Sequence, residues 1–164
     1  MFLIPCVLAL GALAQDLPVL PSFTITTQVL EVSQGTKVTR ENAALLPDAK
    51  VLLKPTLRAL SGNEAKMFIG DEIKYAIDAK TTGVARTGWS ITATATEDKD
   101  GLIRLAFHPE WSHVTRWHQK LPEISTRFVD TTSLLKSGEK VLVPFGKGDN
   151  KTQLYALVTV ERNQ

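Results

Sequence analysis

The stretch SITATATEDKDGLIRLAF, residues 90–107, contains two alternating segments on either side of a polar turn. In the first segment Ile91, Ala93 and Ala95 alternate with threonines, and in the second segment apolar residues again occupy every other position. Alternation with period two places these apolar side chains on one face of a β-strand, because successive side chains point to opposite sides. The intervening Asp-Lys-Asp-Gly sequence ends in Gly101, and glycine tolerates the positive φ that hairpin turns require. The stretch therefore predicts a β-hairpin with one buried face.

The same alternation recurs near both ends of the chain, in residues 23–32 (FTITTQVLEV) and 154–160 (LYALVTV). Between these ends, turn-forming residues separate further short apolar runs. One of these runs, residues 51–60, contains Pro55, which lacks an N–H donor and so predicts an edge strand or a bulge. About nine short strands and almost no helix predict an all-β or β-rich domain, built as an antiparallel sheet of short strands and hairpins.

Glycines and polar clusters set the predicted boundaries elsewhere. Residues 64–77 are predicted as two strands, because a Gly-Asp pair interrupts their apolar pattern. Residues 81–88 carry two glycines and are predicted as a loop, as is the polar and aromatic region 111–121. Residues 125–135 are predicted as a single threonine-rich strand, and residues 41–46 as one short helical turn.

Length and charge limit the classes of protein. The chain has 164 residues, which suffices for one domain with a hydrophobic core. Its formal net charge is +2, and its lysines and arginines are scattered. The sequence therefore contains no basic cluster that could bind along the phosphate backbone of a nucleic acid. The sequence therefore argues against a nucleic acid partner.

The first fourteen residues, MFLIPCVLALGALA, carry no charged side chain and end in Ala-Leu-Ala. This pattern predicts a signal peptide that is cleaved before Gln15, and hence export. The alternative is a buried N-terminal strand or helix, because no Lys or Arg precedes the apolar run. Cys6 is the single cysteine, so the mature chain would contain none and could form no disulfide. Residues 15–22 are predicted as a proline-containing leader arm, and residues 23–164 as one β domain.

Residue types that carry chemistry are present but do not converge in the sequence. His108, His113 and His118 lie five residues apart, a spacing that places successive histidines on opposite faces of a strand. The stretch GKGDNKT, residues 146–152, lacks the spacing of a phosphate-binding loop, and no G-x-S-x-G motif occurs. We therefore expect no enzyme activity, no cofactor and no metal. The three tryptophans, at positions 89, 111 and 117, are expected in the core or at its rim, with a sugar or peptide platform as the alternative.

The order of these segments resembles the C-terminal secretin domain of type II and type III secretion outer-membrane channels. Residues 23–33 resemble the opening strand of that domain, and residues 49–75, 87–112 and 122–145 resemble its three following blocks. Residues 154–162 resemble its closing strand. The positions that match as structural motif residues are Pro55, Gly62, Glu64, Ala65, Gly70, Gly88, Gly101, Pro109, Arg127 and Gly138.

The resemblance implies a secretin-like sheet and a role in protein secretion across the bacterial outer membrane, as one component of an oligomer. It also implies that the exported chain is located in the periplasm or the outer membrane. Its partners would be copies of itself or subunits of a secretion system. The chain departs from the family pattern in its short segment between Ser33 and Val51, in Ala95 where the family has proline, and in the missing proline- and leucine-rich motif after Phe145. These departures predict that the chain keeps the sheet but does not form a large channel on its own.

Two alternatives remain open at the level of sequence. One is a soluble periplasmic or cell-surface β domain that binds protein partners without forming a pore. Threonine-rich strand faces opposite the apolar ones favour it, because such faces suit water or a partner better than lipid. The other is a secreted hydrolase or sugar-binding β domain, for which the sequence offers little support.

Overall fold

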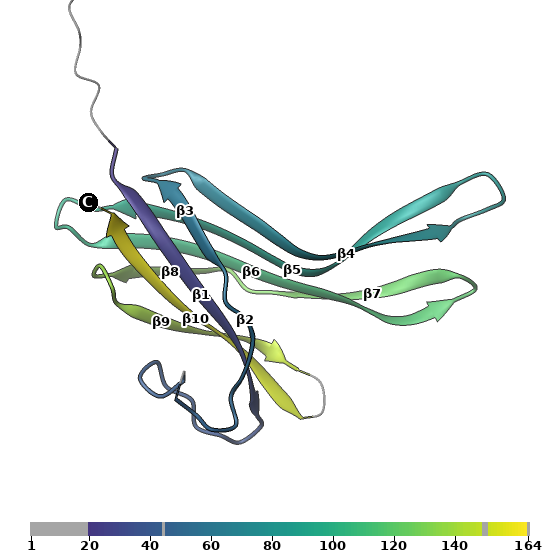
Figure 1. Cartoon of the computed structure of the whole chain (residues 1–164), viewed down its shortest axis with the longest axis horizontal. Coiled ribbons are helices and arrows are strands. Elements are labelled where there is room, and N and C mark those ends of the chain that lie inside the picture. Colours follow the sequence, from purple (N-terminus) through teal and green to yellow (C-terminus); the bar gives the residue numbers. More distant parts are fainter. Residues whose placement is uncertain (1–19, 44, 149–150, 164) are drawn as a thin grey trace, which may run out of the picture.

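A computed structural model of the chain describes residues 20–43, 45–148 and 151–163. The predicted signal peptide and most of the predicted leader arm lie outside the described residues. Within them, the chain forms ten β-strands in two antiparallel sheets and no helix (Figure 1). The expectation of an all-β fold is thereby confirmed.

The first sheet joins the two ends of the chain. Its strands are β1 (Ser22–Ser33), β2 (Lys50–Leu53), β3 (Thr56–Leu60), β9 (Lys140–Lys147) and β10 (Thr152–Asn163). β10 lies between β1 and β9, while β2 and β3 both pair with the other side of β1. The predicted run 51–60 is thus an edge of the sheet that is interrupted at Pro55, as its missing N–H requires. The Pro55 carbonyl still accepts a hydrogen bond of 2.9 Å from the Thr27 amide.

The second sheet is built from consecutive hairpins. Its strands are β4 (Glu64–Ala76), β5 (Thr82–Glu97), β6 (Ile103–His118), β7 (Leu121–Phe128) and β8 (Thr131–Leu135). They follow the order β4-β5-β6-β7, and β8 pairs with the part of β6 that β7 leaves free. The predicted turn at 98–101 joins β5 to β6, with the Gly101 amide donating to the Asp98 carbonyl at 3.1 Å.

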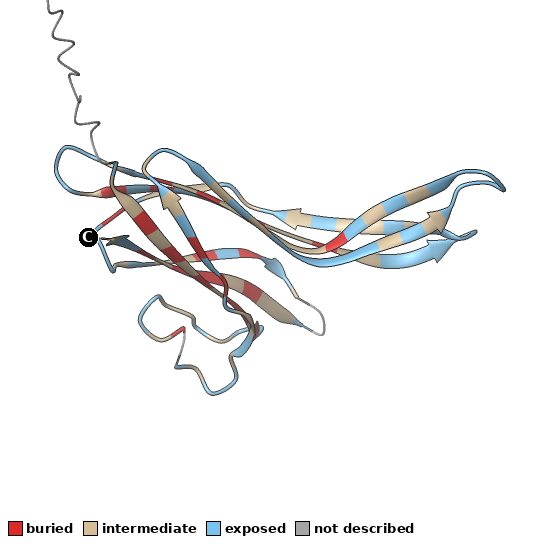
Figure 2. Ribbon diagram, turned by 45° about the horizontal axis from the view of Figure 1, so that its top comes forward, coloured by how far each residue is buried: buried red, intermediate tan, exposed pale blue. Residues whose placement is uncertain are grey.

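The two sheets pack face to face at one end of the molecule and enclose the main core. The alternating residues predicted from sequence line it, including Phe23 and Ile25 of β1, Ile91 of β5 and Phe107 of β6, each at most 2% exposed. Figure 2 shows the buried residues concentrated where the sheets overlap, while the long strands beyond are largely exposed. The sandwich is therefore the stable body of the protein.

A second, smaller cluster lies on the outer face of the first sheet. Leu30 and Val32 of β1 point to this side, next to Leu157 of β10, and the segment 34–49 covers them with Ala43. The predicted helical turn falls within this segment. The Ala43 amide donates a hydrogen bond to the Thr39 carbonyl there, which closes a turn and does not continue into a helix. The short segment between β1 and β2 thus serves as a cover for the sheet.

Three of the predicted boundaries are wrong. β4 runs without interruption through Gly70, residues 82–88 belong to β5, and residues 111–118 belong to β6. These segments form long hairpins whose two faces are both partly exposed, so their apolar alternation is confined to short stretches, and the glycines and polar residues between these stretches resemble turn signals. The glycines in them permit close approach between strands and do not mark turns.

The predicted single strand 125–135 is two strands, β7 and β8, separated at Val129 and Asp130. Both pair with β6, on either side of His108 and Pro109. Proline has no N–H to donate to a neighbouring strand, so the ladder is interrupted where Pro109 faces this edge.

Candidate functional site: a two-hairpin arm

The second sheet extends beyond the sandwich as an arm of two hairpins (Figure 1). We define the arm as residues 70–88, the distal part of β4 and β5, and residues 112–127, the distal part of β6 and β7. Pairing between β5 and β6 runs from Glu97 with Ile103 to Gly88 with Ser112 and stops there. Beyond that point each hairpin is held only by its own ladder. The arm is therefore a pair of separate hairpins that share one base.

Two paired glycines lie where the hairpins separate. Gly70 and Gly88 face each other across β4 and β5, and Gly88 has a φ of +136°. A Cβ at Gly70 would lie 2.0 Å from the Thr87 carbonyl oxygen, and one at Gly88 would lie 2.4 Å from the Ile69 carbonyl oxygen. Only glycine fits both positions, because the neighbouring atoms are backbone and cannot rotate away.

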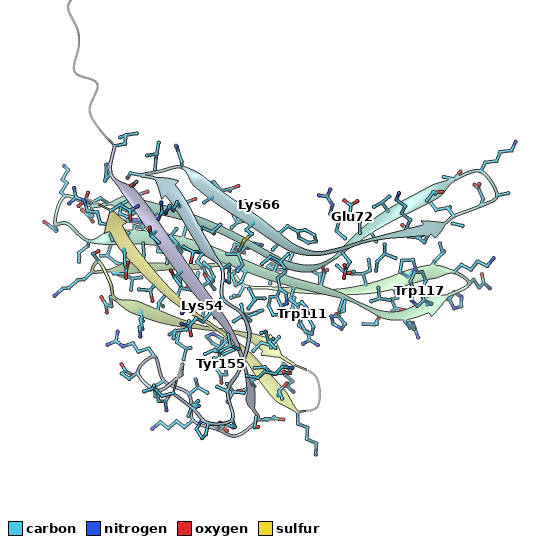
Figure 3. The ribbon with its side chains drawn as sticks, viewed as in Figure 1. Lys54, Lys66, Glu72, Trp111, Trp117 and Tyr155 are labelled. Carbon is cyan, nitrogen blue, oxygen red and sulfur yellow. The ribbon has the colours of Figure 1, made fainter. Side chains whose placement is uncertain are left out.

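Stacked aromatic rings connect the base of the arm to the sandwich. Trp89 of β5 stacks on Trp111 of β6 with ring centroids 5.5 Å apart, and Phe145 of β9 meets Trp89 edge-on, also at 5.5 Å. Phe145 belongs to the first sheet and is only 5% exposed. The contact thus links the two sheets at the point where the arm begins (Figure 3, which labels Trp111).

Two nitrogen-bearing side chains complete this base. The Arg127 guanidinium carbon of β7 lies 5.1 Å from the Trp111 ring centroid, and the His113 ring stacks on the same indole at 4.4 Å. Within the described part of the chain, Arg127 Nη1 and His113 Nδ1 are buried without a hydrogen-bond partner. The cation is stabilised by the face of the indole and not by a carboxylate.

The tips of the two hairpins differ in how their turns are made. The β6–β7 turn consists of Gln119 and Lys120, with φ of 47° and 72°, which is the pattern of a tight two-residue hairpin turn. In the β4–β5 turn, Asp78 Oδ1 accepts hydrogen bonds from the amides of Lys80 at 2.7 Å and Thr81 at 2.8 Å. These bonds lower the pKa of the Asp78 carboxyl, the Lys80 amide contributing most.

An open groove lies between the two tips. It is lined by Lys74, Tyr75 and Ala76 of β4, by Trp117 of β6 and by Lys120 of the second turn. Residues of both hairpins thus line one groove, although β4 and β6 are not neighbours in the order of the sheet. The groove is therefore a product of the way the separated hairpins come together.

The three histidines lie apart, as their spacing predicted. His108 is on β6 with its Nδ1 2.6 Å from Asp130 Oδ1, His113 is in the aromatic stack, and His118 ends β6. In the part of the chain that the structure describes, no group of three or more His, Cys, Asp or Glu side chains is placed to hold a metal ion.

The ten motif residues named from sequence occupy three kinds of position. Gly62, Gly101 and Gly138 lie in turns with φ of +79°, +72° and +82°. The Gly62 amide donates to the Ala95 carbonyl at 2.9 Å, and the Gly138 amide donates to the Val160 carbonyl at 2.8 Å. These turns are thus tied to neighbouring strands.

The remaining motif residues lie in or beside strands. Glu64 and Ala65 begin β4, and the two prolines, Pro55 and Pro109, lie at the ladder interruptions described above. Gly70, Gly88 and Arg127 alone among the ten reach the arm: the glycines at the point of separation and the arginine in the aromatic base. The family motif therefore marks scaffold positions for the most part.

Sequence reasoning did not assign the aromatic base or the tip groove. A signal for the base was present, because Trp89 and Trp111 continue the alternating core faces of their strands, as Ile91 and Phe107 do. No comparable signal existed for the groove, whose lysines and aromatic rings come from two hairpins that pair with each other at their base alone.

What the arm presents is binding chemistry: strand edges, exposed aromatic rings and lysines.

The chain is similar in fold to solved secretins, at identities that show the fold alone. These include the type II secretion system secretin GspD of E. coli K12 (15% identity, TM-score 0.59, covering 88% of this chain and 51% of that one). PulD in the Klebsiella pneumoniae type II secretion system outer membrane complex aligns at 11% identity with a TM-score of 0.59, covering 90% and 41%. The Salmonella type III secretion injectisome secretin InvG aligns at 11% identity with a TM-score of 0.50, covering 88% and 61%.

The fold and the arm define an antiparallel β domain of the secretin type. Residues 46–144, more than half of the chain, match the family model described as secretin, the bacterial type II and III secretion system protein, and the chain belongs to this family. It spans 41% to 61% of the length of the three solved secretins named above. No curated protein matches the sequence. Among the described residues, the structure contains no helix that is long and apolar enough to cross a membrane.

Proposed function

We propose that the chain is a structural subunit of a secretin-type assembly that serves protein secretion across the bacterial outer membrane. Copies of the chain join edge to edge into a ring, and the subunit has no catalytic role. Membership of the secretin family supports the secretion-system role. The oligomer and the membrane location rest on the edges of the second sheet.

The observation that carries the proposal is that both edges of this sheet are open. Among the described residues, no strand pairs with the outer edge of β4, and none pairs with the outer edges of β7 and β8. β4 alone presents thirteen residues of such an edge. Long exposed edges are templates for pairing with another chain, and proteins normally cover them. A second copy of the sheet is the natural cover.

Strand direction favours a closed ring. β4, β5, β6 and β7 alternate in direction, so β7 runs opposite to β4. If copies are related by rotation about an axis along the strands, the β4 of one copy meets the β7 and β8 of its neighbour in antiparallel orientation. An even number of strands per copy thus lets one antiparallel ladder continue around the ring and leaves no edge exposed.

The experiment mixes isotopically light and heavy chains and treats them with an amine-reactive crosslinker. Antiparallel docking without a register shift brings Lys66 of β4 level with His108, so Lys136 of the neighbouring copy, which follows β8, lies about 20 Å along the shared edge, within reach of a long crosslinker; both lysines are exposed. We expect light–heavy crosslinks between these two lysines, and ring-shaped particles by electron microscopy and native mass spectrometry. Lys54, between β2 and β3 on the other sheet, is the matched control and should form no such link to Lys136.

Two outcomes would contradict the proposal. Crosslinks exclusively within single chains, together with a monomeric mass in detergent and in vesicles, would favour the alternative: a soluble periplasmic or cell-surface β domain that binds protein partners without forming a pore. Light–heavy crosslinks that join Lys54 as often as Lys66 would show nonspecific association.

A further inference from the structure

We propose that the groove between the two hairpin tips binds the phosphate-bearing headgroup of an anionic lipid. This inference deepens the proposed function and rests on it, because an assembly at a membrane brings the free end of the arm to a lipid surface. Figure 3 shows Trp117, which lines the groove, near the end of the arm that is most distant from the sandwich.

The groove combines cations with aromatic rings. Lys74 of the first hairpin and Lys120 of the second both line it, together with Tyr75 and Trp117. The lysine ammonium groups, the indole N–H and the phenol O–H are all hydrogen-bond donors, which suit the acceptor oxygens of a phosphate. Ala76 and the ring faces add apolar wall, which suits the hydrocarbon next to such a headgroup.

The carboxylates near the tips do not neutralise these lysines. Asp78 accepts the amides of its own turn, and Glu123 pairs with Arg116. Within the described part of the chain, neither Lys74 nor Lys120 takes part in an ion pair, and no carboxylate lines the groove. The groove is therefore cationic and complementary to an anion.

Exposed apolar side chains beside the groove favour a lipid over an acidic peptide. Trp117 is 54% exposed, and Ile77 and Leu121 at the two tips are 55% and 42% exposed. Tryptophan and tyrosine are enriched where apolar and aqueous phases meet, and lysines near an anionic membrane surface add electrostatic attraction. A lipid surface supplies both the phosphate and the hydrocarbon that these side chains would contact.

The test is co-sedimentation of the full chain with vesicles of phosphatidylcholine, alone or mixed with phosphatidylglycerol. We expect binding to the mixed vesicles, and a loss of about fivefold in affinity for each groove lysine removed. The Lys74→Gln, Lys120→Gln double variant should therefore bind roughly 25-fold more weakly. Lys54→Gln, Lys99→Gln removes the same charge from exposed sites on the body, away from the groove and from the open sheet edges, and should bind as the wild type does. Circular dichroism checks that both variants are folded.

Three outcomes would overturn the inference. The first is an equal loss of vesicle binding in both double variants. The second is full competition by inorganic phosphate at matched ionic strength. The third is that the chain binds an acidic peptide, in a manner that depends on Lys74 and Lys120, but does not bind vesicles. Crosslinking of Lys66 to Lys136 in the groove variant separates this test from the proposed assembly. A retained ring with lost vesicle binding supports the groove, whereas wild-type vesicle binding without a ring would contradict the assembly alone.

Discussion

Replacement of Gly88 by alanine should destabilise the protein more than replacement of a glycine in an ordinary turn. Gly88 has a φ of +136°, and an added Cβ would lie 2.4 Å from the Ile69 carbonyl oxygen and 2.5 Å from the Gly70 Cα. Both of these are backbone atoms of the neighbouring strand, so the overlap is relieved only if β4 and β5 move apart. Separation would in turn weaken the ladder that holds the first hairpin to the body.

Two costs add at Gly88. A non-glycine residue at positive φ costs about 1–3 kcal/mol. Forced overpacking costs about a further 1–3 kcal/mol, so the free energy of unfolding should fall by about 2–6 kcal/mol. For a chain of this size the melting midpoint should drop by at least about 4 °C. Gly101→Ala is the matched control, because Gly101 has a φ of +72° but no atom within 4 Å of an added Cβ. It should cost about 1–2 kcal/mol.

Gly70→Ala separates the two effects. An added Cβ there would lie 2.0 Å from the Thr87 carbonyl oxygen, while the glycine has no positive φ. Its cost should therefore come from overlap alone. The assay is thermal and urea unfolding of the three variants, followed by the fluorescence of Trp89 and Trp111. If the Gly88→Ala variant had the same melting midpoint as the Gly101→Ala variant, the close approach of the two strands would be refuted.

Four further expectations follow from the same features. Arg127→Met should change the free energy of unfolding by less than about 1 kcal/mol in urea titrations, because the loss of the cation–π contact offsets the removal of a buried guanidinium nitrogen that has no partner among the described residues; a large destabilisation would reveal a partner for the guanidinium. The pKa of the Asp78 carboxyl is lowered in the folded state, chiefly by the Lys80 amide, so its contribution is present above the unfolded pKa and is lost as the pH falls through the folded value. The protection factors of the Lys80 and Thr81 amides, which correct for the intrinsic slowing of exchange in acid, should accordingly fall as the pH is lowered, and Asp78→Asn should remove that dependence. Chain recovered from outside the cytoplasm should begin at or near Gln15 in N-terminal sequencing, and a retained first residue would contradict export. In planar-bilayer recordings the purified chain should not produce large, stable conductance steps by itself, even as a ring, since the proline- and leucine-rich motif of the family is absent after Phe145; such steps would show that the short sequence suffices for a channel.

The strands of the sandwich could be predicted from sequence because one face of each is buried. Burial on one face leaves period-two alternation, which is visible in residues 23–29, 90–107 and 154–160, and these segments became β1, the β5–β6 hairpin and β10. Local chemistry sufficed for the turn at Gly101 and for the interruption at Pro55. Each of these features depends on neighbours within a few positions along the chain.

The extent of the arm could not be predicted in this way, because its hairpins expose both faces and alternate only over short stretches, such as residues 72–77. Gly70 resembles a turn signal in sequence, and only its pairing with Gly88 shows that it permits close approach between strands. Pairing between β1 and β10 is likewise invisible, since Thr24 meets Glu161 from the other end of the chain.

The sequence by itself determined the all-β class, the core faces of the sandwich strands and the secretin resemblance, because these depend on local periodicity and on the order of motifs. Tertiary structure alone decided where the hairpins separate, how Trp111 comes to lie between His113 and Trp89, and that Lys74 and Lys120 share one groove. The physical reason is that these contacts join residues from different strands, and the register and twist that bring them together are set by the packing of the whole sheet.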